Sequence, residues 1–252
     1  MTIPASSATA RGRGQLAIRT LAAVLVIVTV TMTLARYNSI AKPFALMVFQ
    51  LGGLIALGIV AISAAGMRQG RYLVLRDRLP NLAATGAALA FAGLASSSIW
   101  AAVSTPELYD VTTDLAHPPE FAVLPPRADS EPGVDKPGTK RALQAREYGD
   151  LQRQTVARPA DQVARAALEL AKASGWTVVG SDLANGRIEA TDTVSYLRWH
   201  DDVIIQISPA ANGSGAVVNM RSVSREGTRD FGRNAARIRA FLARLASTVA
   251  QS

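Results

Sequence analysis

Three long apolar stretches in the first part of the chain constrain its fold most. They cover residues 16–35, 44–66 and 82–103, and the second and third contain no charged side chain. Each reaches the ~20 residues that an α-helix needs to cross ~30 Å of hydrocarbon. Arg19 lies close enough to the end of the first stretch to extend toward lipid headgroups. We therefore predict three transmembrane helices rather than buried helices of a soluble domain.

A signal peptide is the alternative interpretation of the first stretch, because Arg11, Arg13 and Arg19 would form its basic region. The two later stretches would hold the chain in the membrane in either case. Since these two carry no ionisable group, and transport pathways need such groups, we interpret the region as an anchor.

The positions of the charges predict how the chain is oriented. Its 27 Lys+Arg and 19 Asp+Glu give a net charge of +8, all of which belongs to residues 1–103. The basic part is thus also the apolar part, which argues against a nucleic-acid-binding protein. Lys and Arg are concentrated before the first stretch and between the second and third, and none occurs between residue 104 and Arg127. The preference of such residues for cytoplasmic loops predicts a multi-pass protein of the bacterial inner (plasma) membrane, with its N-terminus cytoplasmic and its C-terminal domain periplasmic.

Residues 104–158 form a proline-rich, extended segment in this prediction. Proline lacks an N–H donor and restricts the residue before it, which disfavours regular structure. Within this segment, the polar, Gly- and Pro-rich stretch 128–141 is the candidate for a mobile region. A short helix is expected over 142–154.

Residues 159–252 predict a small α+β domain. A helix is expected from Pro159 to Gly175, and an Asn185-Gly186 turn favours a hairpin between two strand-like runs. The four predicted strands cover 176–181, 187–193, 202–208 and 216–223. A closing helix from about Asp230 carries an apolar stripe that the sheet can cover. The predicted fold is a membrane α-helical anchor of three transmembrane helices plus an α+β two-layer sandwich, in the order helix, four-stranded antiparallel sheet, helix.

Several motifs between residues 110 and 242 resemble those of a bacterial and plant family, domain of unknown function 1499 (DUF1499). They are DVTTDLAHPPEF (110–121), GW (175–176), IEAT (188–191), HDDVII (200–205) and RSVSREGTRDFGRNAARIRAFL (221–242). The resemblance covers about Tyr109 to Leu245 and implies no activity. The sequence departs from the family pattern at Gln206, Glu226 and Arg229.

The densest polar sequence, residues 221–242, carries the candidate site. Asp230 is placed to cap the closing helix. One interpretation is a structural network of Arg–Asp pairs, and the other is a pocket in which arginines bind an anionic group. The hypothetical ligand-binding residues are Arg221, Ser222, Ser224, Arg225, Asp230, Asn234, Arg237 and Asp202.

Catalytic chemistry finds less support in the sequence, and we assign no catalytic residue. Asp201 and Asp202 are paired carboxylates, but neighbours on a strand point to opposite faces. With no Cys and two His residues, no metal site or cofactor is expected. We predict a binding or assembly role at the cell envelope; an enzyme that uses the Asp/Ser/Arg cluster on an envelope component is the alternative. The expected partners are the lipid bilayer and either an anionic envelope ligand or a membrane protein, and no nucleic acid.

Overall fold

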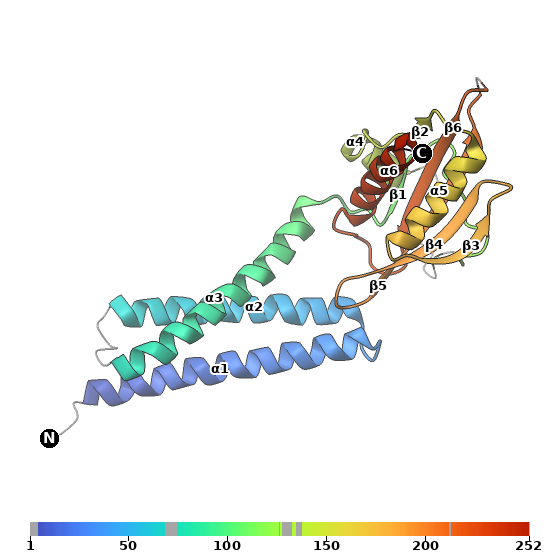
Figure 1. Cartoon of the computed structure of the whole chain (residues 1–252). Coiled ribbons are helices and arrows are strands. Elements are labelled where there is room, and N and C mark those ends of the chain that lie inside the picture. The colour runs from blue at the N-terminus through green and yellow to red at the C-terminus, as the bar shows by residue number, and fades with distance from the viewer. Residues whose placement is uncertain are drawn as a thin grey trace. The chain divides into compact units, whose positions relative to one another are not determined.

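The computed structural model describes residues 5–68, 75–125, 127, 133–134, 138–211 and 213–251, with no side-chain detail for 5–14 and 75–78. The chain divides into two compact units, Met1–Ser104 and Thr105–Ser252 (Figure 1).

The first unit consists of three long helices, α1 (Ala5–Arg36), α2 (Lys42–Arg68) and α3 (Leu75–Ser104). Three stretches in them are long and apolar enough to cross a membrane: Gln15–Arg36, Lys42–Arg68 and Leu79–Ser104. The three long apolar helices agree with the prediction, and these candidate spans differ from the predicted bounds by one to three residues at each end. The chain is therefore a candidate multi-pass membrane protein.

Close packing between α2 and α3 depends on a small residue. A Cβ atom added to Gly53 would lie 2.2 Å from Cβ of Ala95, so no larger residue fits without a shift of the helices. Next to it, Gly52 faces Phe91 of α3 and Val24 of α1. The glycines thus let three helices approach closely, as small residues do in membrane bundles.

The second unit is built on one antiparallel sheet of six strands. The strand order is β1-β6-β5-β4-β3, and β2 pairs with β6 on the same side as β1. The strands are β1 (Asp110–Thr112), β2 (Gln154–Val156), β3 (Thr177–Asp182), β4 (Arg187–Val194), β5 (Trp199–Pro209) and β6 (Ala216–Ser224). The helices are α4 (Thr139–Glu147), α5 (Ala160–Ala173) and α6 (Arg233–Gln251).

This architecture confirms the predicted helix, four antiparallel strands and helix, which correspond to α5, β3 to β6 and α6. Glycines stand at two of the predicted turns: Gly175 ends α5 with φ +80°, and Gly186 joins β3 to β4 with φ +65°. The structure adds two strands, β1 and β2, in the segment predicted to be extended. Both have three residues, too few for an alternating pattern to be recognised.

The candidate mobile stretch, 128–141, falls largely on residues 128–132 and 135–137, which lie outside the described residues. Of the remainder, Val134 is fully buried and donates its N–H to Asp110. The expected helix over 142–154 is α4, which begins and ends earlier than predicted, at Thr139 and Glu147.

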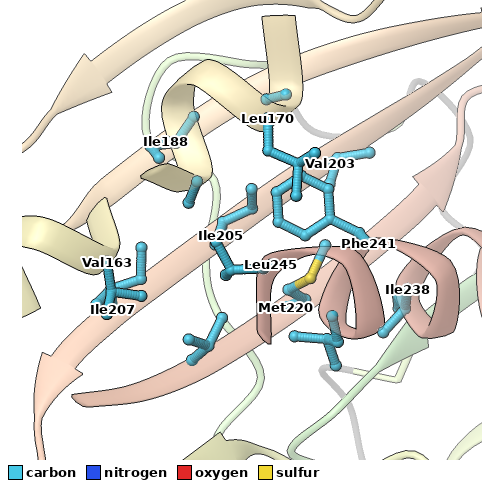
Figure 2. Packing of buried hydrophobic residues seen from close by; sticks show 14 of the residues in the cluster. Val163, Leu170, Ile188, Val203, Ile205, Ile207, Met220, Ile238, Phe241 and Leu245 are labelled. Carbon is cyan, nitrogen blue, oxygen red and sulfur yellow. The ribbon is translucent and has the colours of Figure 1, made fainter. Parts of the chain in front are cut away.

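The hydrophobic core lies between one face of the sheet and the two helices α5 and α6 (Figure 2). Ile188, Val203, Ile205 and Met220 project from the strands, and Trp176 stacks on Phe241 of α6 with ring centroids 5.0 Å apart. We call this side of the sheet the helix face and the opposite side the far face.

Candidate functional site

Neighbouring residues of β5 supply one carboxylate to each face of the sheet. Asp201 accepts a hydrogen bond from Arg237 of α6, on the helix face, whereas Asp202 accepts from Arg225, on the far face. This confirms the expectation that the two carboxylates point in opposite directions. The polar residues therefore form two clusters rather than one pocket.

Arg237 is the centre of the cluster on the helix face. Its guanidinium donates to Asp192 (Nε–Oδ2, 3.0 Å), to Asp201 (Nη2–Oδ2, 2.6 Å) and to Asn234 (Nη1–Oδ1, 2.6 Å). The same Nη1 also donates to Ser222 Oγ at 2.9 Å. Only 7% of the Arg237 side chain is exposed. Because both strands β4 and β5 are tied to α6 in this way, the cluster fixes the helix on the sheet.

Asp230 holds the start of α6, as its position predicts. Its carboxylate accepts the backbone N–H groups of Gly232 (2.8 Å) and Asn234 (2.7 Å), which would otherwise be unpaired at the helix end. Burial raises the pKa of Asp230 above its ordinary value, and the negative charge of Asp201 raises it further. The two N–H groups and Arg233 act in the opposite direction.

One carboxylate oxygen in this cluster has no hydrogen-bond partner among the described residues. It is Oδ1 of Asp201, a residue that is 1% exposed. Ser224 lies opposite Asp201 on β6, and its hydroxyl accepts from Asn234 Nδ2 at 3.1 Å. A buried oxygen without a donor is costly and calls for a physical explanation.

On the far face, Arg221 and Asp110 form a buried ion pair. Two parallel hydrogen bonds join them, Nε–Oδ1 at 2.9 Å and Nη2–Oδ2 at 2.8 Å. The side chains are 10% and 3% exposed. Arg221 also donates to the backbone carbonyl of Pro119 at 3.3 Å, so its guanidinium connects β6, β1 and the chain after β1.

Arg225 makes the second bidentate pair of the far face. It donates to both oxygens of Asp202 at 2.8 Å and to the hydroxyl of Thr191 at 2.9 Å. The hydrogen bonds that Arg225 donates to Asp202 raise the pKa of Arg225 above its ordinary value. In contrast to Arg221, the Arg225 side chain is 38% exposed. Within the part of the chain that the structure describes, its Nη1 group makes no hydrogen bond, so one edge of a fixed guanidinium is not held by the domain.

Glu189 is a buried residue of the far face that the sequence did not single out. It is fully buried, and its carboxylate accepts three consecutive backbone N–H groups, from Ala122 (2.7 Å), Val123 (3.0 Å) and Leu124 (2.9 Å). These donors belong to residues 116–125, a segment without helix or strand that we call the strap. Glu189 and Arg221 together hold the strap against the sheet.

Gln144 and Arg127 make further contacts within the domain that sequence reasoning missed. The Gln144 side chain of α4 pairs with both backbone groups of Thr112, as a neighbouring strand would. Arg127 donates to the carbonyls of Ser224 (2.7 Å) and Gly227 (2.6 Å). Each contact joins residues at least 32 positions apart, and no local pattern marks such a pair.

The eight predicted ligand-binding residues thus separate by face. Ser222, Ser224, Asp230, Asn234 and Arg237 meet on the helix face, and Arg221, Arg225 and Asp202 lie on the far face. Their ligand-binding role stays a prediction. Among the described residues, no group of three or more His, Asp or Glu side chains is arranged to hold a metal ion.

Comparison with known proteins identifies the second unit. A family model described as "Protein of unknown function (DUF1499)" matches residues 110–245, which is more than half of the chain. No curated protein matches the chain. The matched residues begin with β1 and end within α6, so they contain both polar clusters and the strap.

Proposed function

We propose that this chain, which belongs to the DUF1499 family, is a membrane-anchored binding protein that presents its DUF1499 domain at the periplasmic side of a bacterial inner membrane. Its ligand is an anionic group of an envelope component, and Arg225 is the residue that contacts it. Three features support this: the candidate spans, the distribution of Lys and Arg around them, and the burial and hydrogen bonding of the arginines in the domain.

The exposed edge of Arg225 is the observation that carries the binding role. Arg221 and Arg237 are buried, and each guanidinium forms an ion pair with an aspartate of the same domain. Arg225 is fixed by Asp202 and Thr191, and its side chain is still 38% exposed, with no hydrogen bond from Nη1 among the described residues. A guanidinium that is already oriented loses little rotamer entropy when it binds a carboxylate or phosphate.

Orientation is tested with alkaline phosphatase, which is active only after export. In a bacterial host, alkaline phosphatase fused after Ser252 should be active. The same enzyme fused after Arg76, between the second and third spans, should be inactive, because a loop rich in Lys and Arg favours the cytoplasm. The reverse pattern would overturn the periplasmic location.

Anion binding is tested on the full chain in detergent with inorganic phosphate as the probe. Phosphate at millimolar concentration should raise the melting temperature, because a ligand that binds only the folded state stabilises it. Arg225→Gln should abolish the rise. Arg165→Gln is the matched control, because Arg165 is an exposed arginine paired with Asp161 on the outer surface of α5. An equal loss in both variants, or no rise in the native chain, would refute a site at Arg225.

The unpartnered oxygen of Asp201 favours a second candidate, an enzyme acting on an envelope component. A buried carboxylate beside a carboxyl of raised pKa is typical of acid–base sites. In such an enzyme Asp201→Asn would abolish turnover, whereas in the binding protein it would leave phosphate binding unchanged.

A further inference from the structure

The strap, residues 116–125, is held on the far face mainly by polar contacts. Among its side chains, Pro119 and Leu124 are buried, whereas Val123 is 59% exposed. Glu189 accepts three of its N–H groups, Arg221 donates to its Pro119 carbonyl, and Asn219 donates to its His117 carbonyl at 3.3 Å. The sheet therefore binds the backbone of the strap through side chains of β4 and β6, and the Val123 and Phe121 side chains add contacts with Gly180 and Arg221.

The groups under the strap are those that recognise an extended peptide. A carboxylate can bind a peptide backbone by accepting successive N–H groups, and a guanidinium can do so by donating to a carbonyl. In peptide recognition, pockets for alternate side chains then add specificity. Glu189 lies on β4 and Arg221 on β6, so the contacts extend across three strands of the sheet. Both residues are at most 8% exposed, which means that the strap shields them from water.

The chain on either side of the strap is attached independently of it. Before the strap, β1 pairs with β6, and Thr113 donates its backbone N–H to Met220. After the strap, Arg127 donates to Ser224 and Gly227. Release of the strap would therefore leave the sheet and its helices in place, as in a local opening.

We propose that the far face is a peptide-binding surface and that the strap occupies it as an internal competitor. The partner is an extended polypeptide segment with a proline placed like Pro119 and free N–H groups placed like those of Ala122, Val123 and Leu124. It binds when the strap opens, and Glu189 and Arg221 then contact the partner's backbone. This inference rests on the proposed binding role and adds the class of partner to it.

The test is to open the strap without changing the surface beneath it. Val123→Pro removes the central N–H donor to Glu189, and the side chain it replaces is 59% exposed, with its remaining surface against Gly180 of β3. A labelled peptide with the sequence of residues 116–125 should bind the full-length variant at least about tenfold more tightly than the native chain, whose surface is already occupied. Fluorescence polarisation measures this, and Glu189→Gln in the same chain should remove the gain. Val123→Ala, which keeps the N–H, is the matched control and should behave like the native chain.

A folded Val123→Pro chain that does not bind the peptide would overturn the proposal. If that variant does not fold, hydrogen exchange of the native chain decides. The amides of Ala122, Val123 and Leu124 should exchange at least about a hundredfold faster than those of Ile204 and Ile205 in β5. Equal protection would mean that the strap opens only on global unfolding and would also overturn the proposal. Phosphate stabilisation through Arg225 would survive either result, so failure of this site is distinguishable from failure of the proposed function.

Discussion

The far face contains two bidentate Arg–Asp ion pairs that differ in burial. Their contributions to the stability of the domain can therefore be compared. Arg221→Met and Arg225→Met each remove a guanidinium and keep an unbranched side chain. Arg221 is 10% exposed and its partner Asp110 3%, whereas Arg225 is 38% exposed and its partner Asp202 7%. If burial controls the free energy of these pairs, the two substitutions should differ greatly in cost.

The contacts left behind set the expected magnitudes. Without Arg221, the N–H donor that Asp110 keeps among the described residues is that of Val134 at 2.9 Å, and Asp110 is 2% exposed. Loss of one partner of a buried pair costs about 3–5 kcal/mol, which lowers the folding equilibrium constant by about two to three and a half orders of magnitude. Without Arg225, Asp202 keeps the Thr191 hydroxyl, and water can reach the vacated side. We expect Arg225→Met to lower the free energy of unfolding by about 1–2 kcal/mol. This is more than the loss of an exposed ion pair costs, because the Asp202 carboxylate is itself buried.

Urea unfolding of the full chain in detergent measures both costs. Trp176 is in the domain core against Phe241, so its fluorescence reports on the unfolding of this unit. Asp110→Asn combined with Arg221→Met should recover part of the loss, because the uncompensated charge is then removed. A cost for Arg221→Met below about 1 kcal/mol, or below that of Arg225→Met, would refute the argument from burial.

Two further predictions concern the turns and the start of α6. Gly175→Ala should cost about 1–2 kcal/mol for its left-handed backbone alone, because nothing lies within 4 Å of the added Cβ. Gly186→Ala should cost clearly more, because its Cβ would lie 2.0 Å from the carbonyl oxygen of Ile207; equal melting temperatures for the two variants would contradict this. For Asp230, the folded-state pKa is raised, so proton binding favours the folded domain below the unfolded value near 3.8 and this contribution disappears as pH rises through the folded pKa. The stability of the native chain relative to Asp230→Asn, measured by urea unfolding across pH, should therefore fall as pH rises above about 3.8, and a rise would contradict the sign.

Local patterns were sufficient to predict the three long apolar helices and the main elements of the domain. The alternation of Val203, Ile205 and Ile207 placed β5, and the stripe through Ile238 and Leu245 placed α6; all five residues are buried in the core. These signals are local because a strand or helix repeats its side-chain direction every few residues. The cap at Asp230 was predictable for the same reason, since its partners are two and four residues away.

The partners of the buried charges could not be predicted, because they are distant in sequence. Glu189 binds N–H groups 65 to 67 residues away, and Asp110 binds an arginine 111 residues away. A Glu within a strand normally indicates a solvent-exposed face, and this expectation fails where a segment such as the strap covers that face. The proline-rich composition of the strap predicted the absence of regular structure and gave no indication that the segment is fixed to the sheet.

The division of the polar residues between two faces also changes which of the arginines can meet a ligand. Arg221, Arg225 and Arg237 lie within 17 positions of one another in the sequence, and a basic pocket was one of the two interpretations of this run, beside a structural network of Arg–Asp pairs. Each arginine instead has an aspartate partner on its own side of the sheet, so most of the positive charge is neutralised inside the domain. A phosphate or carboxylate must therefore bind through hydrogen bonds from the exposed edge of Arg225 rather than through a strong field from three cations. The strap site needs no such field, because Glu189 and Arg221 contact uncharged backbone groups, and the two proposed sites should accordingly differ in their sensitivity to salt.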